Sequence, residues 1–284
     1  MEKVTDWILL WKQLVESRSH TWKKSGSSEG ENDHWRGKAQ SFNNGVKQRW
    51  VKPDSHRDFI LSLLKGNQGS TVLDIGAGTG GWAVPMARLA KKVTAIEPSS
   101  EMIRLMTENL KREGIGNVEI VQGSWPNKGI EIEPHDFSLC SHAMYGCPDL
   151  PSFVRAMADA TRKNCLMLIR APAHDGIMAK AAGRIWEHPH DSPNFQVAYG
   201  AMLQMGIYPH VFMGSPDQWE PWTSASLEEA VAEVKRRFGL VSPSEHDAFL
   251  QDLIESRLTF QEGKYVWPRE VRSALIYWES TGGK

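Results

Sequence analysis

Short apolar stretches alternate with longer amphipathic stretches through the middle of the chain. The apolar stretches have the length of buried parallel strands, and they cover residues 72–75, 93–96, 118–121, 137–141 and 165–169. The amphipathic stretches between them predict helices over residues 82–90, 100–110 and 149–162. Because strands that alternate with helices pair in parallel, this pattern predicts an α/β fold with a doubly wound, mostly parallel sheet.

The N-terminal part of the chain has a different pattern. Trp7 and Trp11 fall on one apolar face of a predicted helix, and residues 24–34 are polar and rich in glycine and serine. We expect this polar stretch to be a mobile loop. Pro53 and Asp54 then mark the beginning of a further helix.

The pattern also loosens after the fifth predicted strand. The elements expected there are a helix near 195–205, a strand near 207–213, helices at 226–238 and 245–258, and a last strand at 273–278. The remaining segments, 171–193 and 214–262, have the character of insertions. Together with residues 1–50, they are expected to cover the carboxyl edge of the sheet and shape a substrate pocket.

Residues 71–81, Thr-Val-Leu-Asp-Ile-Gly-Ala-Gly-Thr-Gly-Gly, carry the most informative motif. The first strand ends at Asp74, and glycines follow at once, where the backbone must turn and approach a ligand closely. Gly76, Gly78 and Gly81 match the dinucleotide pattern G-x-G-x-x-G, which favours NAD(P). Asp74 argues against that alternative, because its carboxylate would repel a pyrophosphate. A ligand with an amino group at this place would be attracted.

Asp74, Gly76, Gly78 and Gly80 resemble motif I of the class I S-adenosylmethionine-dependent methyltransferases, commonly V-L-D-x-G-x-G-x-G. The resemblance implies a Rossmann-like sheet of seven strands, the last one antiparallel and inserted beside the fifth. It also implies that these four residues bind S-adenosylmethionine, which becomes S-adenosylhomocysteine. We therefore expect a methyltransferase domain at 51–284, preceded by a helical lid segment at 1–50.

The second predicted strand ends in an acid, Glu97, followed by Pro98. Glu97 lies about twenty residues after Asp74, the offset expected of a carboxylate that binds ribose hydroxyls. Since NAD and S-adenosylmethionine both contain ribose, Glu97 does not distinguish between them. A solvent-exposed charge at a strand end is the alternative interpretation.

The third predicted strand leads into Ser124 and Trp125. In the methyltransferase family this turn recognises adenine, often with Asp where Ser124 stands. The resemblance implies that the Ser124 hydroxyl and the Trp125 amide bind the adenine ring. A simple turn followed by a core tryptophan is the alternative.

The fourth predicted strand ends in Ser141, and His142 and Tyr145 follow. This segment resembles motif IV, which faces the methionine end of the cofactor. His142 could act as a general base for an acceptor hydroxyl or amine, with Tyr145 close to the transferred methyl group. A packed, hydrogen-bonded histidine is the alternative, because methyl transfer often needs only alignment of the reactants.

Trp35 and Phe42 resemble the aromatic-x-x-x-Ala-x-x-aromatic entry segment of small-molecule methyltransferases, which covers the cofactor. A plain packing helix would produce the same spacing. Trp219 and Trp222 lie in a predicted loop, where they could form, together with Trp35, an aromatic wall for a planar or cationic substrate.

The run His188-Pro-His190-Asp191 suggests a metal site, but its spacing matches no regular ligand pattern. We expect a solvated or substrate-facing loop there and no metal.

Composition narrows the range of partners. The chain has 284 residues, a formal net charge of −1 and three cysteines without C-x-x-C spacing. The balanced charge disfavours a nucleic-acid substrate, and the cysteines favour a reducing, cytoplasmic compartment. No apolar run reaches the ~18 residues of a membrane span.

The expected function is methyl transfer to a small molecule, with an NAD(P) oxidoreductase or a catalytically silent cofactor-binding subunit as alternatives. The oligomeric state and the acceptor atom are not encoded in any pattern identified in the sequence.

Overall fold

The computed structural model describes residues 5–24, 33–126, 129 and 131–280, and these ranges contain a large central sheet. The strands of the sheet are β1 (Thr71–Ile75), β2 (Lys92–Glu97), β3 (Val118–Gln122), β4 (His135–Ser141), β5 (Thr161–Pro172), β6 (His210–Met213) and β10 (Val271–Glu279). The helices are α1 (Trp7–Lys24), α2 (Ala39–Trp50), α3 (Ser55–Lys65), α4 (Ala83–Ala87), α5 (Ser100–Arg112), α6 (Leu150–Asp159), α7 (Ile177–Ile185), α8 (Phe195–Gln204), α9 (Leu227–Phe238) and α10 (Asp247–Arg257).

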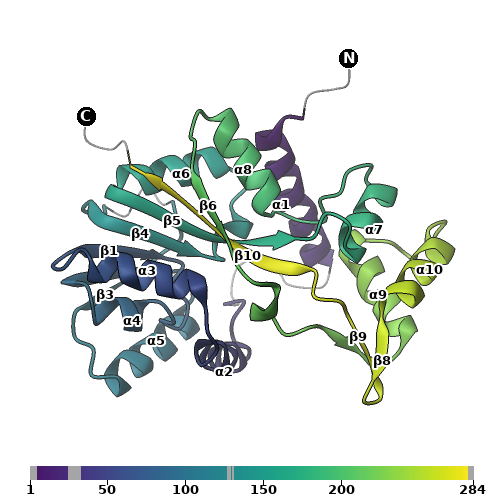
Figure 1. Cartoon of the computed structure of the whole chain (residues 1–284), viewed down its shortest axis with the longest axis horizontal. Helices are drawn as coiled ribbons and strands as arrows, with labels where there is room; N and C mark the ends of the chain where they lie inside the picture. Colours follow the sequence, from purple (N-terminus) through teal and green to yellow (C-terminus); the bar gives the residue numbers. More distant parts are fainter. Residues whose placement is uncertain (1–4, 25–32, 127–128, 130, 281–284) are drawn as a thin grey trace.

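The seven strands of this sheet follow the order β3-β2-β1-β4-β5-β10-β6 (Figure 1). Strands β1 to β5 pair in parallel, whereas β10 runs antiparallel between β5 and β6. The doubly wound, mostly parallel, Rossmann-like sheet predicted from the sequence is therefore confirmed. The strand order reverses between β1 and β4, which is where ligands bind in folds of this kind.

Helices cover both faces of the sheet because successive side chains of each strand point to opposite faces. Val72 packs on one side with α3, α4 and α5, while Leu73 and Ile75 pack on the other side with α1, α6 and α8. Asp74, which lies between these apolar positions, is 1% exposed. A carboxylate is thus built into the centre of a buried strand.

Two predicted helix starts are confirmed by their caps. The Ser99 hydroxyl accepts a hydrogen bond from the Met102 amide at the start of α5 (3.1 Å), and the Asp54 carboxylate accepts one from the His56 amide at the start of α3 (2.9 Å). Both caps satisfy backbone donors that the first helical turn leaves free.

The two insertions form a lobe of their own beside the sheet, at the right of Figure 1. Its core joins α7, α9 and α10 through residues such as Ile177, Val234 and Leu250. A small sheet, β7-β9-β8, completes the lobe. Its strands are β7 (Thr223–Ser224), β8 (Thr259–Gln261) and β9 (Lys264–Val266). Neither this sheet nor helix α7 was predicted from the sequence.

The N-terminal segment divides into two parts with different surroundings. In α1, Trp11 is fully buried and donates a hydrogen bond from Nε1 to the carbonyl of Cys147 (2.8 Å), and Trp7 packs against Gly200 of α8. Helix α2 lies instead at the carboxyl edge of the sheet. Most of the loop predicted at 24–34 lies outside the described residues. Within the part of the chain that is described, no helix is both long and apolar enough to cross a membrane.

Candidate active site at the carboxyl edge of the sheet

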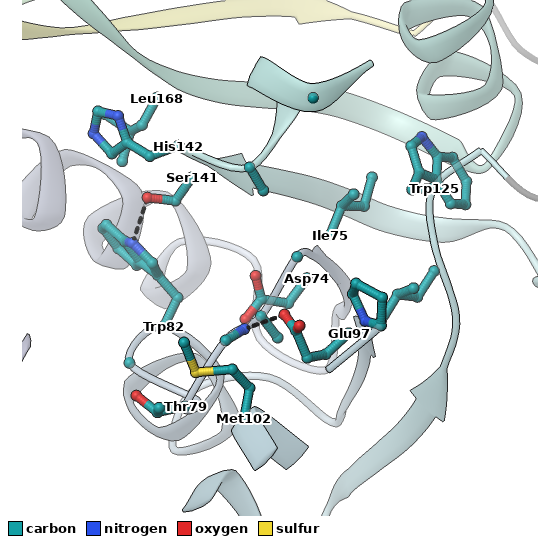
Figure 2. A pocket seen from close by; sticks show the side chains of 18 of the residues that line it. Asp74, Ile75, Thr79, Trp82, Glu97, Met102, Trp125, Ser141, His142 and Leu168 are labelled. Atoms are coloured by element: carbon teal, nitrogen blue, oxygen red, sulfur yellow. Dashed lines mark hydrogen bonds between the residues drawn. The ribbon is translucent and has the colours of Figure 1, made fainter. Parts of the chain in front are cut away.

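A cavity of about 1360 Å³ opens where β1, β2 and β4 end (Figure 2). Its walls include most of the residues predicted to form the site: Trp35, Phe42, Asp74, Gly76, Gly78, Glu97, Pro98, Ser124, Trp125, Ser141 and His142. Gly80 and Tyr145 do not line this cavity. The fold thus brings together segments from five separate parts of the chain.

The glycine turn after β1 depends on glycine for two different reasons. Gly76, Gly78 and Gly80 all have positive φ angles, of 70°, 57° and 80°. At Gly76, a Cβ atom would lie 2.3 Å from the Cβ of Ala143, and at Gly80 it would lie 2.9 Å from Cγ of Met106. Gly80 therefore allows the turn to pack against Met106 of α5, and it does not line the cavity.

Asp74 lies at the floor of the cavity and carries an unsatisfied acceptor. Its Oδ2 atom is buried and has no hydrogen-bond partner among the described residues. Burial, together with the nearby charge of Glu97, raises the pKa of Asp74 to about 7. A buried carboxylate oxygen without a donor destabilises a protein unless a ligand supplies the donor.

Glu97 is held by the backbone on both sides. Its Oε2 accepts a hydrogen bond from the Gly78 amide (2.8 Å), and its Oε1 accepts one from the Ser99 amide (2.9 Å). Burial raises the pKa of Glu97, and the two backbone donors oppose this effect. Since a carboxylate has about four acceptor positions, Glu97 retains capacity for a ligand while it fixes the glycine turn.

The segment predicted as a lid lies over this turn. A Cβ atom at Gly78 would lie 3.7 Å from the Phe42 ring. Trp35 packs on the cluster of Ala39, Met102 and Leu105, and its ring contacts that of Phe42 (5.0 Å between centroids). These residues both pack and line the cavity, so the two interpretations of the segment are compatible.

Asp33, which the sequence did not single out, attaches this segment to the start of α5. Its Oδ2 accepts hydrogen bonds from the Ser99 hydroxyl (2.7 Å), the Ser100 hydroxyl (3.3 Å) and the Glu101 amide (3.0 Å). Its other oxygen accepts one from the Trp35 amide (3.0 Å).

His142 stands at the border of the cavity in a left-handed backbone conformation, with φ of 56°. Its Nδ1 lies 2.9 Å from the Tyr145 hydroxyl and its Nε2 lies 3.3 Å from the Ser273 hydroxyl. The Tyr145 oxygen also accepts a bond from the Arg170 amide (2.7 Å), so its proton points to Nδ1. Burial and the nearby Arg49 lower the pKa of His142, which keeps the ring neutral and makes it a weak base.

A second, smaller cavity of about 260 Å³ lies beyond His142. His142 and Trp219 line both cavities, and Tyr145 and Trp222 line only the second. The remaining wall comes from the end of β5, from α7 and from residues 267–271. Of the aromatic wall expected from Trp35, Trp219 and Trp222, the last two face this second cavity, whereas Trp35 lines only the first.

The predicted adenine turn is at the opposite end of the first cavity. Ser124 is exposed, and the half-buried Trp125 ring donates a hydrogen bond to the carbonyl of Phe153 (3.4 Å). Both residues line the cavity, with the Trp125 ring also packed against the core.

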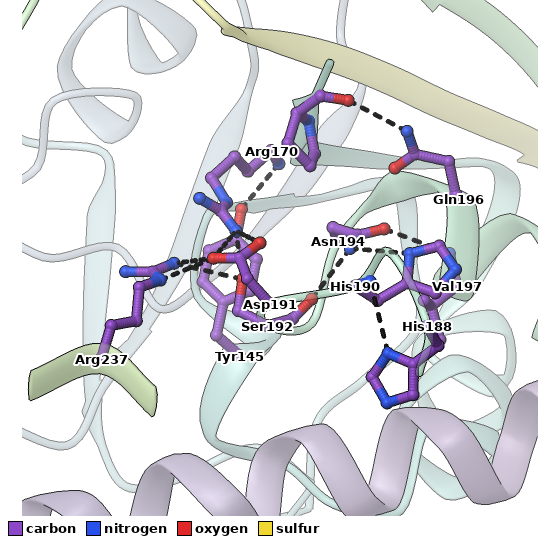
Figure 3. A network of polar contacts seen from close by, with 11 residues as sticks. Tyr145, Arg170, His188, His190, Asp191, Ser192, Asn194, Gln196, Val197 and Arg237 are labelled. Carbon is purple, nitrogen blue, oxygen red and sulfur yellow. Dashed lines mark hydrogen bonds and ion pairs between the residues drawn. The ribbon is translucent and has the colours of Figure 1, made fainter. Parts of the chain in front are cut away.

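The expectation of a solvated or substrate-facing loop at His188–Asp191 is wrong for Asp191, which is buried and lines neither cavity. Asp191 is buried between Arg170 of β5 and Arg237 of α9, and forms ion pairs with both (Figure 3). These two arginines lower the pKa of Asp191 to about 2 despite its burial. The loop folds inward because the cations supply partners that the local sequence does not contain. His190 packs against Trp7.

The sequence analysis did not identify three further residues that line the two cavities. Arg49 lines the first cavity above the rings of Phe42 and Trp219, and Trp82 donates a hydrogen bond to the Ser141 hydroxyl (3.0 Å). Arg170 lines the second cavity. Arg49 follows Phe42 at an interval of two helical turns, and this spacing would have placed both on one face of α2.

Part of the chain is similar to known proteins. Residues 72–164 match the model of a family described as "Methyltransferase domain". A probable ribosomal RNA small subunit methyltransferase A of Methanosphaera stadtmanae is 33% identical over 75 residues, covering 26% of this chain and 28% of that protein. Protein-L-isoaspartate O-methyltransferase of Methanococcoides burtonii is 30% identical over 139 residues, covering 44% of this chain and 66% of that protein. Among solved structures, the YcgJ protein of Bacillus subtilis is 16% identical with a TM-score of 0.49, covering 78% of this chain and 98% of that one.

This chain spans less than two thirds of the length of both curated relatives. The matched residues 72–164 include the motif at Asp74 to Gly80 and the strands β2, β3 and β4. Residues 72–164 of this chain are therefore similar to a methyltransferase domain.

Proposed function

We propose that this chain binds S-adenosylmethionine in the first cavity and transfers its methyl group to a small-molecule acceptor. The observation that carries the proposal is the buried Oδ2 of Asp74, which has no donor among the described residues. The ammonium group of the cofactor would supply that donor. A dinucleotide would instead bring phosphate charge towards a buried carboxylate, which favours S-adenosylmethionine over NAD(P).

The residues around Asp74 fit the other parts of the cofactor. Glu97 has acceptor positions left for the ribose hydroxyls, and Ser124 and Trp125 line the end where adenine would lie. Trp35 and Phe42 would cover the ligand and exclude water. When bound, S-adenosylmethionine supplies a methyl group activated by a positively charged sulfur.

The lid segment 1–50 and the methyltransferase domain 51–284 belong to this proposal. Only residues from Trp35 to Trp50 of the described part of that segment line the cavity. We assign the covering role to this portion, and α1 serves as a packing helix. We propose no metal in the reaction.

Within this proposal, His142 orients the acceptor. The ring is neutral and hydrogen-bonded through both nitrogens, and Nε2–H faces Ser273 once Tyr145 donates to Nδ1. Such a ring can align a nucleophile at the border of the two cavities, where alignment supplies most of the rate advantage. The acceptors of the relatives, ribosomal RNA and protein, differ from each other, so the acceptor is inferred from this chain's own cavities. The small volume of the second cavity, about 260 Å³, favours a small molecule.

Calorimetry with S-adenosylhomocysteine, NAD and NADP tests the cofactor assignment. We expect binding of S-adenosylhomocysteine alone, and a loss of roughly tenfold or more in Asp74→Asn, because a charge-assisted hydrogen bond is weakened. Binding of NAD in preference to S-adenosylhomocysteine would refute the proposal. Formation of S-adenosylhomocysteine from S-adenosylmethionine in a panel of small metabolites then distinguishes an enzyme from a silent cofactor-binding subunit.

A further inference from the structure

The second cavity has a mainly apolar wall suited to a planar or hydrocarbon body. Trp219, Trp222 and Trp267 line it together with Met178 and Ala179. The rings of Trp222 and Trp267 meet edge to face at 5.9 Å. The volume of about 260 Å³ falls just below the ~300–1,000 Å³ typical of pockets for drug-sized ligands. The cavity therefore favours a compact ligand with much apolar surface.

One charged group in this wall is not fully neutralised. Arg170 and Arg237 both pair with a single carboxylate, Asp191, which leaves one positive charge in surplus (Figure 3). Arg170 uses only Nη2 in this pairing, with Asp191 and the Ser192 hydroxyl as acceptors. Among the described residues, its Nε and Nη1 atoms have no acceptor. Arg170 lines the second cavity, whereas Arg237 lines neither.

The acids at the same cavity have partners of their own. Glu270 accepts a hydrogen bond from the Ile177 amide at the start of α7 (2.7 Å). Glu220 at the mouth forms an ion pair with Lys52, and it lies 4.0 Å from Arg269. Neither of these two acids forms an ion pair with Arg170 among the described residues.

A second cation lies where the two cavities meet. The Arg49 guanidinium is 5.2 Å from the ring centre of Trp219, and it has no hydrogen bond or ion pair among the described residues. The acids of the site, Asp74 and Glu97, belong to the cofactor cavity. Arg49 lines the first cavity, whereas the second contains Arg170 and Arg269 together with Glu220 and Glu270.

We propose that the second cavity binds a small, mainly apolar acceptor that carries one anionic group, with its apolar body against the tryptophans and its anion on Arg170. This inference rests on the proposed function, because the cavity opens towards the methyl-transfer site. A half-buried guanidinium such as that of Arg170 recognises a carboxylate or a similar anion through charge-assisted hydrogen bonds, which gives selectivity by charge as well as by shape.

Three probes with the same ring system and different charges test this inference: indole-3-acetate, indole-3-acetamide and tryptamine. Their binding is measured by calorimetry on protein saturated with S-adenosylhomocysteine. We expect the acetate to bind roughly tenfold more tightly than the acetamide, and tryptamine to bind most weakly, because only the acetate supplies an anion.

Two matched variants assign the selectivity to one residue. Arg170→Gln should reduce the preference for the acetate to below about threefold, because the charge-assisted bond is lost. This variant leaves Asp191 paired with Arg237, so no buried charge is stranded. Arg237→Gln removes the other cation of the cluster but keeps Arg170, and it should retain most of the preference.

Equal affinity for the three probes, tighter binding of tryptamine, or no binding of any probe would each overturn the inference. A preference for the acetate that persists in Arg170→Gln would overturn the assignment to Arg170. The proposed function is judged separately, since it fails if S-adenosylhomocysteine itself does not bind.

Discussion

The two cavities differ in how the chain builds them. The floor of the first comes from one continuous stretch, in which the end of β1, the glycine turn and the end of β2 follow each other between residues 74 and 98. The second is assembled from β5, α7 and residues 216–222 and 267–271, which are distant in sequence. The first cavity is therefore encoded largely by local sequence, whereas the second depends on how the two insertions pack against the sheet.

The largest expected effect comes from adding a side chain to the glycine turn that lines the first cavity. Gly76→Ala combines a positive φ with a clash against Ala143, so we expect the protein to lose about 2–5 kcal/mol of unfolding free energy and all measurable S-adenosylhomocysteine binding. Gly114→Ala is the matched control, since Gly114 has φ of 65° but open space around it. It should lose only about 1–2 kcal/mol and keep its binding. Chemical denaturation measures both, and equal losses would show that the clash is unimportant.

Glu97→Gln should have the next largest effect. The two oxygens of Glu97 accept from the Gly78 and Ser99 amides, and a glutamine would turn its NH₂ group towards one of these donors. We expect S-adenosylhomocysteine binding to weaken roughly tenfold to a hundredfold, because a buried donor is left unpaired. Glu119→Gln on the exposed side of β3 is the control, with no change expected. An unchanged affinity in Glu97→Gln would remove this residue from the cofactor site.

The affinity of the first cavity for S-adenosylhomocysteine should depend on pH. The pKa of Asp74 is about 7 in the free protein, and an ammonium partner holds the carboxylate ionised. S-adenosylhomocysteine affinity should therefore rise about tenfold from about pH 6 to about pH 8, with proton release on binding. Because the folded pKa is raised, the contribution of Asp74 to stability is full below about pH 4 and is lost as pH rises towards about 7.

Calorimetry in buffers of different ionisation enthalpy measures this proton release. Asp74→Asn provides the control, because its binding should be nearly independent of pH over the same range. A flat profile in the wild type would mean that Asp74 does not meet a cation.

Removing a side chain from the second cavity should have the smallest effect on cofactor binding. Trp222→Ala should change S-adenosylhomocysteine affinity by less than about twofold, because Trp222 lines only that cavity. Phe42→Ala should weaken it about fivefold, because an aromatic cover over Gly78 is removed. With indole-3-acetate the order should reverse. If both variants affect both ligands alike, the two cavities act as one site.

Local motifs and the period of the apolar pattern were sufficient to predict the strands of the large sheet and the placement of Asp74 and Glu97. The cap at Ser99 belongs to the same class of local signals. Helix α4 is shorter than expected, and β5 is longer, because tertiary pairing with β10 extends the strand beyond its apolar run.

Other features depend on contacts between distant residues. The local sequence predicts a solvated Asp191, because it contains no cation to pair with the acid. In the structure Asp191 pairs with Arg170 of β5 and Arg237 of α9, which are distant in sequence. Strands β7, β8 and β9 have only two or three residues each, which is too short for an alternating pattern. The roles of His142 and Tyr145 stay predictions, because they depend on a ligand.

The attachment of Asp33 to helix α5 has a consequence for the rate at which ligands exchange. Any motion that lifts residues 33–42 from the first cavity breaks the three hydrogen bonds that Asp33 accepts from Ser99, Ser100 and Glu101. At ~0.5–1.5 kcal/mol each, these bonds keep the lifted state to on the order of one molecule in a hundred. A gate that is closed in both the free and the bound protein slows entry and exit by the same factor. Residence time can therefore be set at Asp33, by a side chain that does not line the cavity, while affinity is set at Asp74 and Glu97.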